Sequence, residues 1–328
     1  MAQQTAHAQW ALDLVVEIDR HRPGFCGEFF RASAERRQVI AAYLSAQPPA
    51  EARMGEVGQF LLAGSHDAIL SAAYETVPQG FRRALRRSGS SGVQKRPFFA
   101  LLYRLLAAPE HKQVTRCVAS LESLDFARLI IIQKLPQSIC RANVVGVLSK
   151  PSEAADIVTA MHLLVARGVS EEALAQSIRN VRDASGISRA FRNALLKANA
   201  PAHPIPAAEG YLPIRSGEEL HSVSREFRNC LRSYATRFME EGSSHAFAVV
   251  RVSAGKGVAH LIREGERWNL EGLYAPRNGR PPSDLREWVK KYLASHGVNV
   301  EDRYVRKSCE WDSVRRLTDR HMLDFDFD

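Results

Sequence analysis

Cys230 is the residue whose type and surroundings could most directly carry out a reaction. It lies in the run FRNCLRSY, residues 227–234. A cysteine becomes a nucleophile when a neighbouring histidine takes the thiol proton and a polar group orients that histidine. Three histidines of the same region are available: His260 lies on a predicted strand, His245 directly precedes another predicted strand, and His221 lies on a predicted helix. His260 occupies an inward position in its strand's alternation, so we expect it to reach toward Cys230.

A second interpretation of Cys230 is structural. At helical spacing, the large apolar residues of this region share one stripe, formed by Phe227, Leu231, Tyr234 and Phe238. A free cysteine on such a stripe behaves as a small hydrophobic residue in the core. Of the adjacent residues Asn229 and Cys230, Asn229 projects off this stripe, so under this interpretation it is the stronger candidate for a functional polar residue. Both interpretations predict a single helix over residues 216–241.

Glu271 completes the hypothetical catalytic set of Cys230, Asn229, His260 and Glu271, and the predicted cleft of this enzyme also contains Asn278. Glu271 could act as a general base if its face of the last predicted strand lines a cleft. Its alternative is a solvated glutamate, or one paired with an arginine such as Arg263. Simple alternation predicts that Glu271 faces away from the side shared by Trp268, Leu270, Gly272 and Tyr274. Asn278 precedes a glycine, which is typical of a turn.

A basic stretch in the first half of the chain is the other candidate site. Six positive charges and no acidic residue occur between residues 82 and 96, namely Arg82, Arg83, Arg86, Arg87, Lys95 and Arg96. The first four fall at i, i+1, i+4 and i+5, which predicts guanidinium groups along one side of a helix. Such a row could contact several phosphates of a nucleic acid. The alternative is a solvated basic face without a specific partner.

Composition supports a basic N-terminal half. The chain has 328 residues and a formal net charge of +9. Residues 51–150 hold 14 Lys and Arg against 7 Asp and Glu, whereas residues 201–328 hold 20 against 19. This distribution favours an anionic partner. The longest apolar runs are too short for a transmembrane helix, and the N-terminus lacks the features of a signal peptide, which predicts a cytoplasmic protein without a membrane partner.

The five cysteines are scattered and form no C-x-x-C pair. They therefore indicate reduced thiols rather than a disulfide framework or a zinc site. No pair of Cys or His ligands has the i, i+3 or i, i+4 spacing of a helical metal site, so we predict no metal and no cofactor.

The order of elements predicts an α+β protein. Residues 1–200 read as an all-helical domain, in which short helices end at prolines and glycines. Residues 201–210 contain three prolines and several alanines and predict a linker. Residues 211–297 predict a small α+β domain, and residues 298–328 a charged tail. In that domain, three alternating runs joined by glycine-containing turns predict an antiparallel three-stranded meander flanked by helices.

The C-terminal domain resembles the PcfJ-like family of plasmid and phage proteins. The resemblance covers about 80 residues and rests on an Asn-Cys pair followed by a tyrosine, a Ser-containing turn into a strand, and a later strand that leads to an asparagine. Its motif positions here are Asn229, Cys230, Tyr234, Ser243, Arg251, Trp268 and Asn278. Asn229 stands where many members have His, and Ala275 stands near a usual Gly. The resemblance implies association with a mobile genetic element and supplies no reaction.

These patterns lead to one main prediction of function and two alternatives. The main prediction is a mobile-element or prophage accessory protein that binds nucleic acid through its basic helical half. The PcfJ-like domain would then serve as a recognition or effector module. One alternative is an enzyme with a C-terminal Cys/His/Glu cleft. The other is an adaptor whose helical array binds a protein partner from the same element or from the host.

Overall fold

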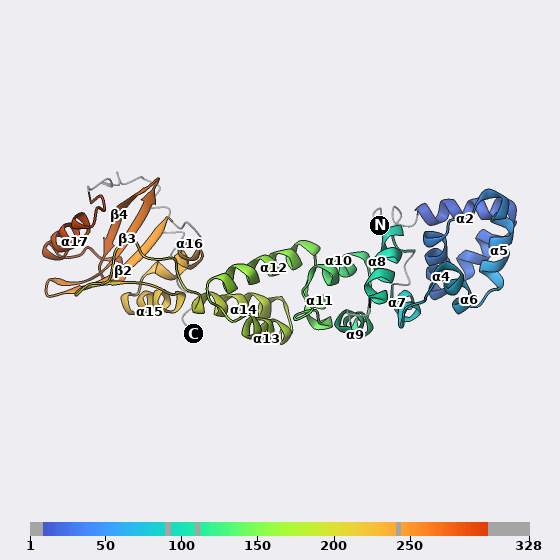
Figure 1. Cartoon of the computed structure of the whole chain (residues 1–328), viewed down its shortest axis with the longest axis horizontal. Coiled ribbons are helices and arrows are strands. Elements are labelled where there is room, and N and C mark those ends of the chain that lie inside the picture. The colour runs from blue at the N-terminus through green and yellow to red at the C-terminus, as the bar shows by residue number, and fades with distance from the viewer. Residues whose placement is uncertain (1–8, 89–92, 109–111, 241–243, 301–328) are drawn as a thin grey trace. The chain divides into compact units, whose positions relative to one another are not determined.

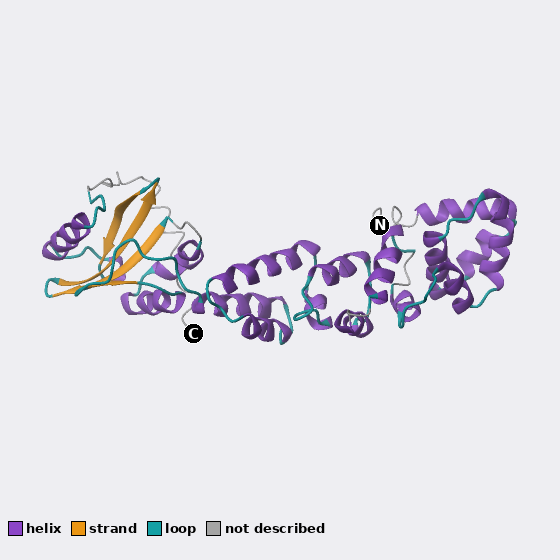
Figure 2. Ribbon diagram, viewed as in Figure 1, coloured by secondary structure: helices purple, strands orange, loops and turns teal. Residues whose placement is uncertain are grey.

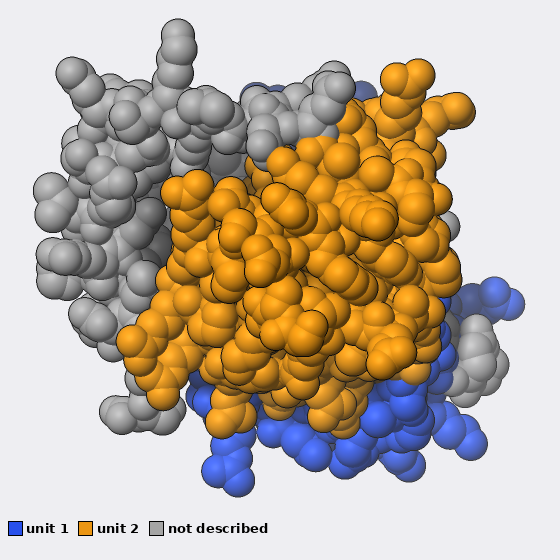
Figure 3. Space-filling model, turned by 90° about the vertical axis from the view of Figure 1, so that its left-hand side faces the viewer, with its two compact units in different colours: residues 1–166, 170–192 blue, residues 167–169, 193–328 orange. Residues whose placement is uncertain are grey.

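The computed structural model describes residues 9–88, 93–108, 112–240 and 244–300. The chain divides into two compact units, which Figure 3 shows in different colours. Unit 1 comprises residues 1–166 and 170–192, and unit 2 comprises residues 167–169 and 193–328. All the described strands lie in unit 2 (Figure 2). The α+β class predicted from the sequence is therefore confirmed.

Unit 1 is a succession of short helices (Figure 1). Its described helical elements are α2 (Gln9–His21), α3 (Phe25–Arg31), α4 (Ala34–Ala46), η1 (Glu51–Arg53), α5 (Met54–Ala63), α6 (His66–Ala73), α7 (Phe81–Arg87), α8 (Arg96–Ala107), α9 (Lys112–Ser120), α10 (Phe126–Lys134), α11 (Ala142–Val147), α12 (Pro151–Ala166), α13 (Glu171–Arg179) and the first residues of α14 (Ala184–Lys197). Here η denotes a 3₁₀ helix.

Side-chain caps and prolines explain where many of these helices begin. The hydroxyls of Ser33, Ser65 and Ser170 each accept a hydrogen bond from the backbone N–H three residues later, and the Asp125 carboxylate does the same. Each such cap satisfies a donor that the first turn leaves unpaired. Pro151 begins α12, where a missing N–H costs nothing.

The segment 201–210 belongs to unit 2 and does not separate the units. Ile205 is only 2% exposed and lies in the core of unit 2. The Tyr292 hydroxyl donates a hydrogen bond to the carbonyl of Pro206. The prolines keep the segment extended, as a linker composition predicts, but its one large apolar residue is buried. The compact units divide instead within α14, between residues 192 and 193.

Unit 2 is built on a four-stranded antiparallel sheet in the order β1-β2-β3-β4. The strands are β1 (Tyr211–Pro213), β2 (His245–Val252), β3 (Gly255–Glu264) and β4 (Arg267–Tyr274). The last three form the predicted meander. β1 is an additional strand that pairs Leu212 with Val249. Three residues ending in proline are too short to show the alternation of a strand, which is why the sequence pattern missed it.

Helices cover both faces of this sheet (Figure 1). One face, including Ala248, Val250 and Leu261, packs in a core with α17 (Ser283–Ser295). On the other face, Phe247 of β2 contacts the rings of Tyr234 and Phe238. These two rings come from η2 (Cys230–Tyr234) and α16 (Ala235–Met239), which follow α15 (Gly217–Phe227).

Candidate functional site

The predicted single helix over residues 216–241 is broken at Arg228. α15 ends there because Arg228 adopts a left-handed backbone conformation with φ 50°. η2 then starts at Cys230, and the Asn229 side chain caps it by accepting a hydrogen bond from the Leu231 N–H. The buried Ser224 hydroxyl stabilises the break by donating to the Asn229 carbonyl at 2.7 Å.

This break decides the position of Cys230. The apolar residues of the stripe remain inside, since Phe227, Leu231 and Phe238 are buried. Cys230 itself is exposed. The interpretation of Cys230 as a small core hydrophobe is therefore wrong, because the change from α to 3₁₀ geometry rotates it out of the stripe.

The polar neighbour of the Cys230 thiol is an amide. The Asn278 side-chain nitrogen lies 4.0 Å from Cys230 Sγ. Asn278 belongs to η3 (Pro276–Asn278), which packs against α15. Arg277 and Asn278 both have positive φ, 59° and 54°. The turn that was predicted at Asn278 thus returns to the start of η2.

His260, which was predicted to reach toward Cys230, contacts His245, Phe247 and Tyr234. It is 5% exposed, and its Nε2 lies 2.9 Å from Nδ1 of His245. Its ring stacks on Phe247 with a centroid separation of 4.4 Å, and the Tyr234 ring meets it edge-on. Burial, reinforced by the neighbouring His245, lowers the pKa of His260 to about 3. Among the described residues no hydrogen bond joins His260 to Cys230.

Glu271 lies at an irregularity of β4. His260 pairs with Gly272 and Leu261 pairs with Leu270, so Glu271 is an extra residue in the ladder, a β-bulge. Leu270 and Leu273 consequently pack on the α17 side. The predicted common face of Trp268, Leu270, Gly272 and Tyr274 is wrong, since the bulge interrupts the alternation on which it was based. Glu271 is exposed.

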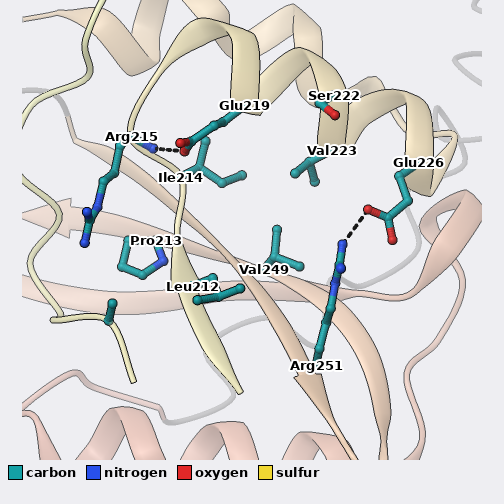
Figure 4. A pocket seen from close by; sticks show the side chains of 11 residues that line it. Leu212, Pro213, Ile214, Arg215, Glu219, Ser222, Val223, Glu226, Val249 and Arg251 are labelled. Atoms are coloured by element: carbon teal, nitrogen blue, oxygen red, sulfur yellow. Dashed lines mark hydrogen bonds and ion pairs between the residues drawn. The ribbon is translucent and has the colours of Figure 1, made fainter. Parts of the chain in front are cut away.

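A pocket of unit 2 lies between β1, β2 and α15, with a volume of about 490 Å³ (Figure 4). Three of its four charged side chains, those of Glu219, Glu226 and Arg251, are engaged within the protein. Glu219 accepts a hydrogen bond from the Arg215 N–H, and Arg251 makes an ion pair with Glu226 at 2.5 Å. Glu226 is also 3.3 Å from the Lys256 ammonium. The pocket therefore presents paired charges over an apolar floor that includes Val249.

The basic stretch of unit 1 does not form one row. Arg82 makes ion pairs with Glu35 of α4 at 2.9 Å and with Asp67 of α6 at 3.4 Å. The half-buried Arg87 donates hydrogen bonds to the carbonyls of Val118 and Ala119 at the end of α9. These two guanidinium groups hold α7 to its neighbours.

The other members of the stretch are exposed. Arg83, Arg86, Lys95 and Arg96 are exposed, and none of their side chains pairs with another described residue. Arg83 and Arg87 line a cleft of about 210 Å³ between α7 and α9, together with Arg116. No carboxylate is present among the described residues that line it. Sequence reasoning missed Arg116, because nothing in its local pattern connects it to α7.

The described residues contain no group of three or more His, Cys, Asp or Glu side chains placed to bind a metal ion. Their four cysteines, Cys26, Cys117, Cys140 and Cys230, are free thiols. Among the described helices, none combines the length and the apolarity that crossing a bilayer requires.

Comparison with protein-family models, with curated proteins and with solved structures found no match to this chain. The resemblance to PcfJ-like proteins therefore stays a prediction. Of its motif residues, Tyr234 contacts His245 and His260, Trp268 packs beside the α17 core, and Arg251 pairs with Glu226. Ser243 lies outside the described residues, as do positions 301–328 of the predicted tail.

Proposed function

We propose that this protein binds nucleic acid through the surface formed by α7 and α9. The observation that carries the proposal is the cleft between these helices, which is lined by Arg83, Arg87 and Arg116 and by no carboxylate among its described residues. Planar guanidinium groups that converge without an acidic partner are suited to phosphate oxygens. Arg86, which is exposed in the last turn of α7, adds to the positive charge of this surface.

The arginines of this surface differ in how far their charges are compensated within unit 1. Arg82 is engaged by two carboxylates, so its charge is largely compensated within unit 1. Arg87 is held by backbone carbonyls and presents only part of its guanidinium group to the cleft. Arg83, Arg86 and Arg116 are therefore the residues that we expect to supply the binding charge.

The biological setting follows from the PcfJ-like resemblance, which implies an accessory protein of a plasmid, transposon or phage acting in the cytoplasm. The enzyme alternative has less support. The polar group in contact with the Cys230 thiol is the side-chain amide of Asn278. His245 and His260 hydrogen bond with each other. An amide cannot take the thiol proton, whereas a nucleophilic cysteine needs a base that can.

The test is the salt dependence of binding to a labelled DNA duplex, followed by fluorescence anisotropy. The variant replaces Arg83, Arg86 and Arg116 with Gln. Loss of three phosphate contacts is expected to lower the slope of log K against log salt by roughly 2.7 and to weaken binding roughly 100-fold at 0.15 M salt.

A matched control replaces three exposed arginines elsewhere in unit 1, Arg20, Arg31 and Arg53, with Gln. This control has the same net charge as the test variant, so any difference in DNA affinity between them depends on where the arginines lie in unit 1. Equal binding by the two variants would contradict the proposal, as would an absence of binding by the parent protein at low salt. Far-ultraviolet circular dichroism checks that the helices are retained.

A further inference from the structure

A second group of arginines lies in unit 2, around the contact between η2 and η3. Two segments without any acidic residue meet there: residues 227–239 and residues 272–283. They carry Arg228 and Arg232 on one side of the contact and Arg277 and Arg280 on the other, and these four residues are called the η2–η3 patch below. Arg237 follows in the first segment.

The four arginines of the patch are available for a ligand. All four are exposed, and none makes an ion pair or a side-chain hydrogen bond with another described residue. By contrast, the basic side chains beside the patch, Arg251 and Lys256, both pair with Glu226. The first segment is flanked by two acidic residues, Glu226 and Glu240. The charge of Glu226 is neutralised by Arg251 and Lys256. Glu240 lies near His245.

The backbone here is held in a conformation that ordinary residues avoid. Arg228, Arg277 and Asn278 are the non-glycine residues with positive φ in the described part of the chain, and all three lie at this contact. Residues with a Cβ atom rarely adopt the left-handed conformation, and arginine does so less often than asparagine. The contact of Asn278 with Cys230, together with the Ala275 N–H bonded to the Gly279 carbonyl, holds the turn that directs Arg277 and Arg280.

An aromatic residue belongs to the same segment as Arg277 and Arg280. Tyr274, at the end of β4, is 37% exposed. A Cβ atom on Gly272 would lie 2.5 Å from the Tyr274 hydroxyl, so the ring lies over Gly272 and needs a glycine there. A partly exposed tyrosine ring that lies against a strand can stack with a nucleobase.

We infer that the η2–η3 patch is a second binding surface, and that its ligand is single-stranded nucleic acid. Unpaired guanidinium groups bind phosphates, exposed Tyr274 stacks with a base, and the side-chain amides of Asn229 and Asn278 can hydrogen bond with base edges. A single strand fits better than a duplex, because bases that stack on a tyrosine must be unpaired. This surface shares no residue with the α7–α9 cleft, so either could fail without the other.

The test uses the full chain and a fluorescently labelled oligothymidylate. Replacing the four patch arginines with Gln is expected to lower the salt slope by roughly 2.8 and to weaken binding roughly 100-fold at 0.15 M salt, at about 0.7 per phosphate contact for single strands. The matched control replaces four exposed basic residues elsewhere in unit 2, Arg215, Arg263, Arg267 and Lys291, and is expected to bind like the parent.

Two further variants separate the proposal from a folding defect and from simple charge attraction. Arg232→Gln with Arg280→Gln avoids the positive-φ positions and is expected to show half of the slope change. Tyr274→Ala is expected to weaken oligothymidylate binding roughly 10-fold and to leave binding to an abasic oligonucleotide unchanged, whereas Tyr274→Phe retains stacking.

The outcomes distinguish the alternatives. If the four-arginine variant binds like its control while the α7–α9 variant loses binding, the patch is not a nucleic-acid surface and the proposed function of unit 1 stands. If the patch variant loses binding to phosphatidylserine vesicles but keeps its affinity for the oligonucleotide, the ligand is a membrane and the inference is overturned. Equal effects of Tyr274→Ala on normal and abasic strands would also overturn it.

Discussion

The two arginine-rich regions of this chain look similar in sequence and differ in structure. In unit 1, Arg82 and Arg87 are tied to Glu35, to Asp67 and to the end of α9, so half of the four arginines in α7 stabilise the helical array. In unit 2, the four arginines of the η2–η3 patch have no partner among the described residues. The density of positive charge along a chain therefore does not tell which charges a ligand can use.

The difference has a structural origin. α7 is only seven residues long and lies among other helices, so its arginines reach carboxylates and carbonyls that are 15 to 47 positions away in sequence. η2 and η3 lie on exposed turns of unit 2 within segments that hold no acid. Buried apolar side chains such as Phe227 anchor those turns, and the arginines are not needed for that purpose.

The largest expected difference in stability between the two units comes from His260, which is buried between the sheet of unit 2 and Tyr234 of η2. The pKa of His260 is about 3 in the folded protein, against an ordinary value of about 6.5 in the unfolded chain. Above pH 6.5 both states are neutral and stability is full. As pH falls below 6.5 only the unfolded state gains the proton, so unit 2 loses about 2 kcal/mol by pH 5.

His260→Phe keeps the stack on Phe247 and removes the titrating group, so this part of the pH dependence should disappear. The measurement is urea unfolding at pH 7 and pH 5, read by hydrogen exchange in peptides that cover β2 and β3. An unchanged loss of stability in the variant would show that another group is responsible. Unit 1 peptides, measured in the same samples, report whether the effect is confined to unit 2.

A smaller contrast concerns the arginines themselves. Arg87→Ala should destabilise unit 1 by about 1.5 kcal/mol, because the carbonyls at the end of α9 lose a charged donor. Arg232→Ala should change stability by less than about 0.5 kcal/mol, since its side chain has no described partner. Urea unfolding of both variants at pH 7 tests the pair. Similar losses in the free energy of unfolding for Arg87→Ala and Arg232→Ala would contradict the distinction between arginines that stabilise the fold and arginines that are available to a ligand.

The smallest effect concerns the first turns of two helices: α15, which precedes the η2–η3 patch, and α7, which carries the basic residues of unit 1. α15 is capped by the Ser216 hydroxyl, which accepts a hydrogen bond from the Glu219 N–H. α7 follows Gly80, which provides no side-chain cap. Ser216→Ala should cost about 1 kcal/mol, while Ser216→Asp should retain most of the stability because its carboxylate also caps. Thermal unfolding of both variants gives the comparison; equal losses would indicate that Ser216 acts through packing.

Several features of unit 2 were predictable from local patterns, and others were not. The meander and the helix after Pro282 follow from alternation and from turn residues. β1 was missed because three residues carry too little periodicity. The break at Arg228 was missed because the apolar spacing of Phe227, Leu231 and Phe238 continues through it, and only the hydrogen bonds of Ser224 and Asn229 reveal it.

The candidate sites show the same division. The basic stretch is evident from composition, but the pairing of Arg82 depends on residues of two other helices. Arg116 joins Arg83 and Arg87 only when α9 packs beside α7. Cys230 and Asn278 are 48 positions apart, and no local pattern predicts that a turn after β4 returns to the start of η2.

The order of residues along the chain accounts for the fold class, for many helix starts and for the excess of positive charge in the first half. These properties depend on interactions within a few residues, such as caps, turns and alternation, which can be recognised locally. Tertiary structure decided which arginines are paired, which side of β4 faces the sheet's core after the bulge at Glu271, and that Cys230 is exposed. Those outcomes depend on side chains brought together from distant positions, and their energies are set by packing and burial.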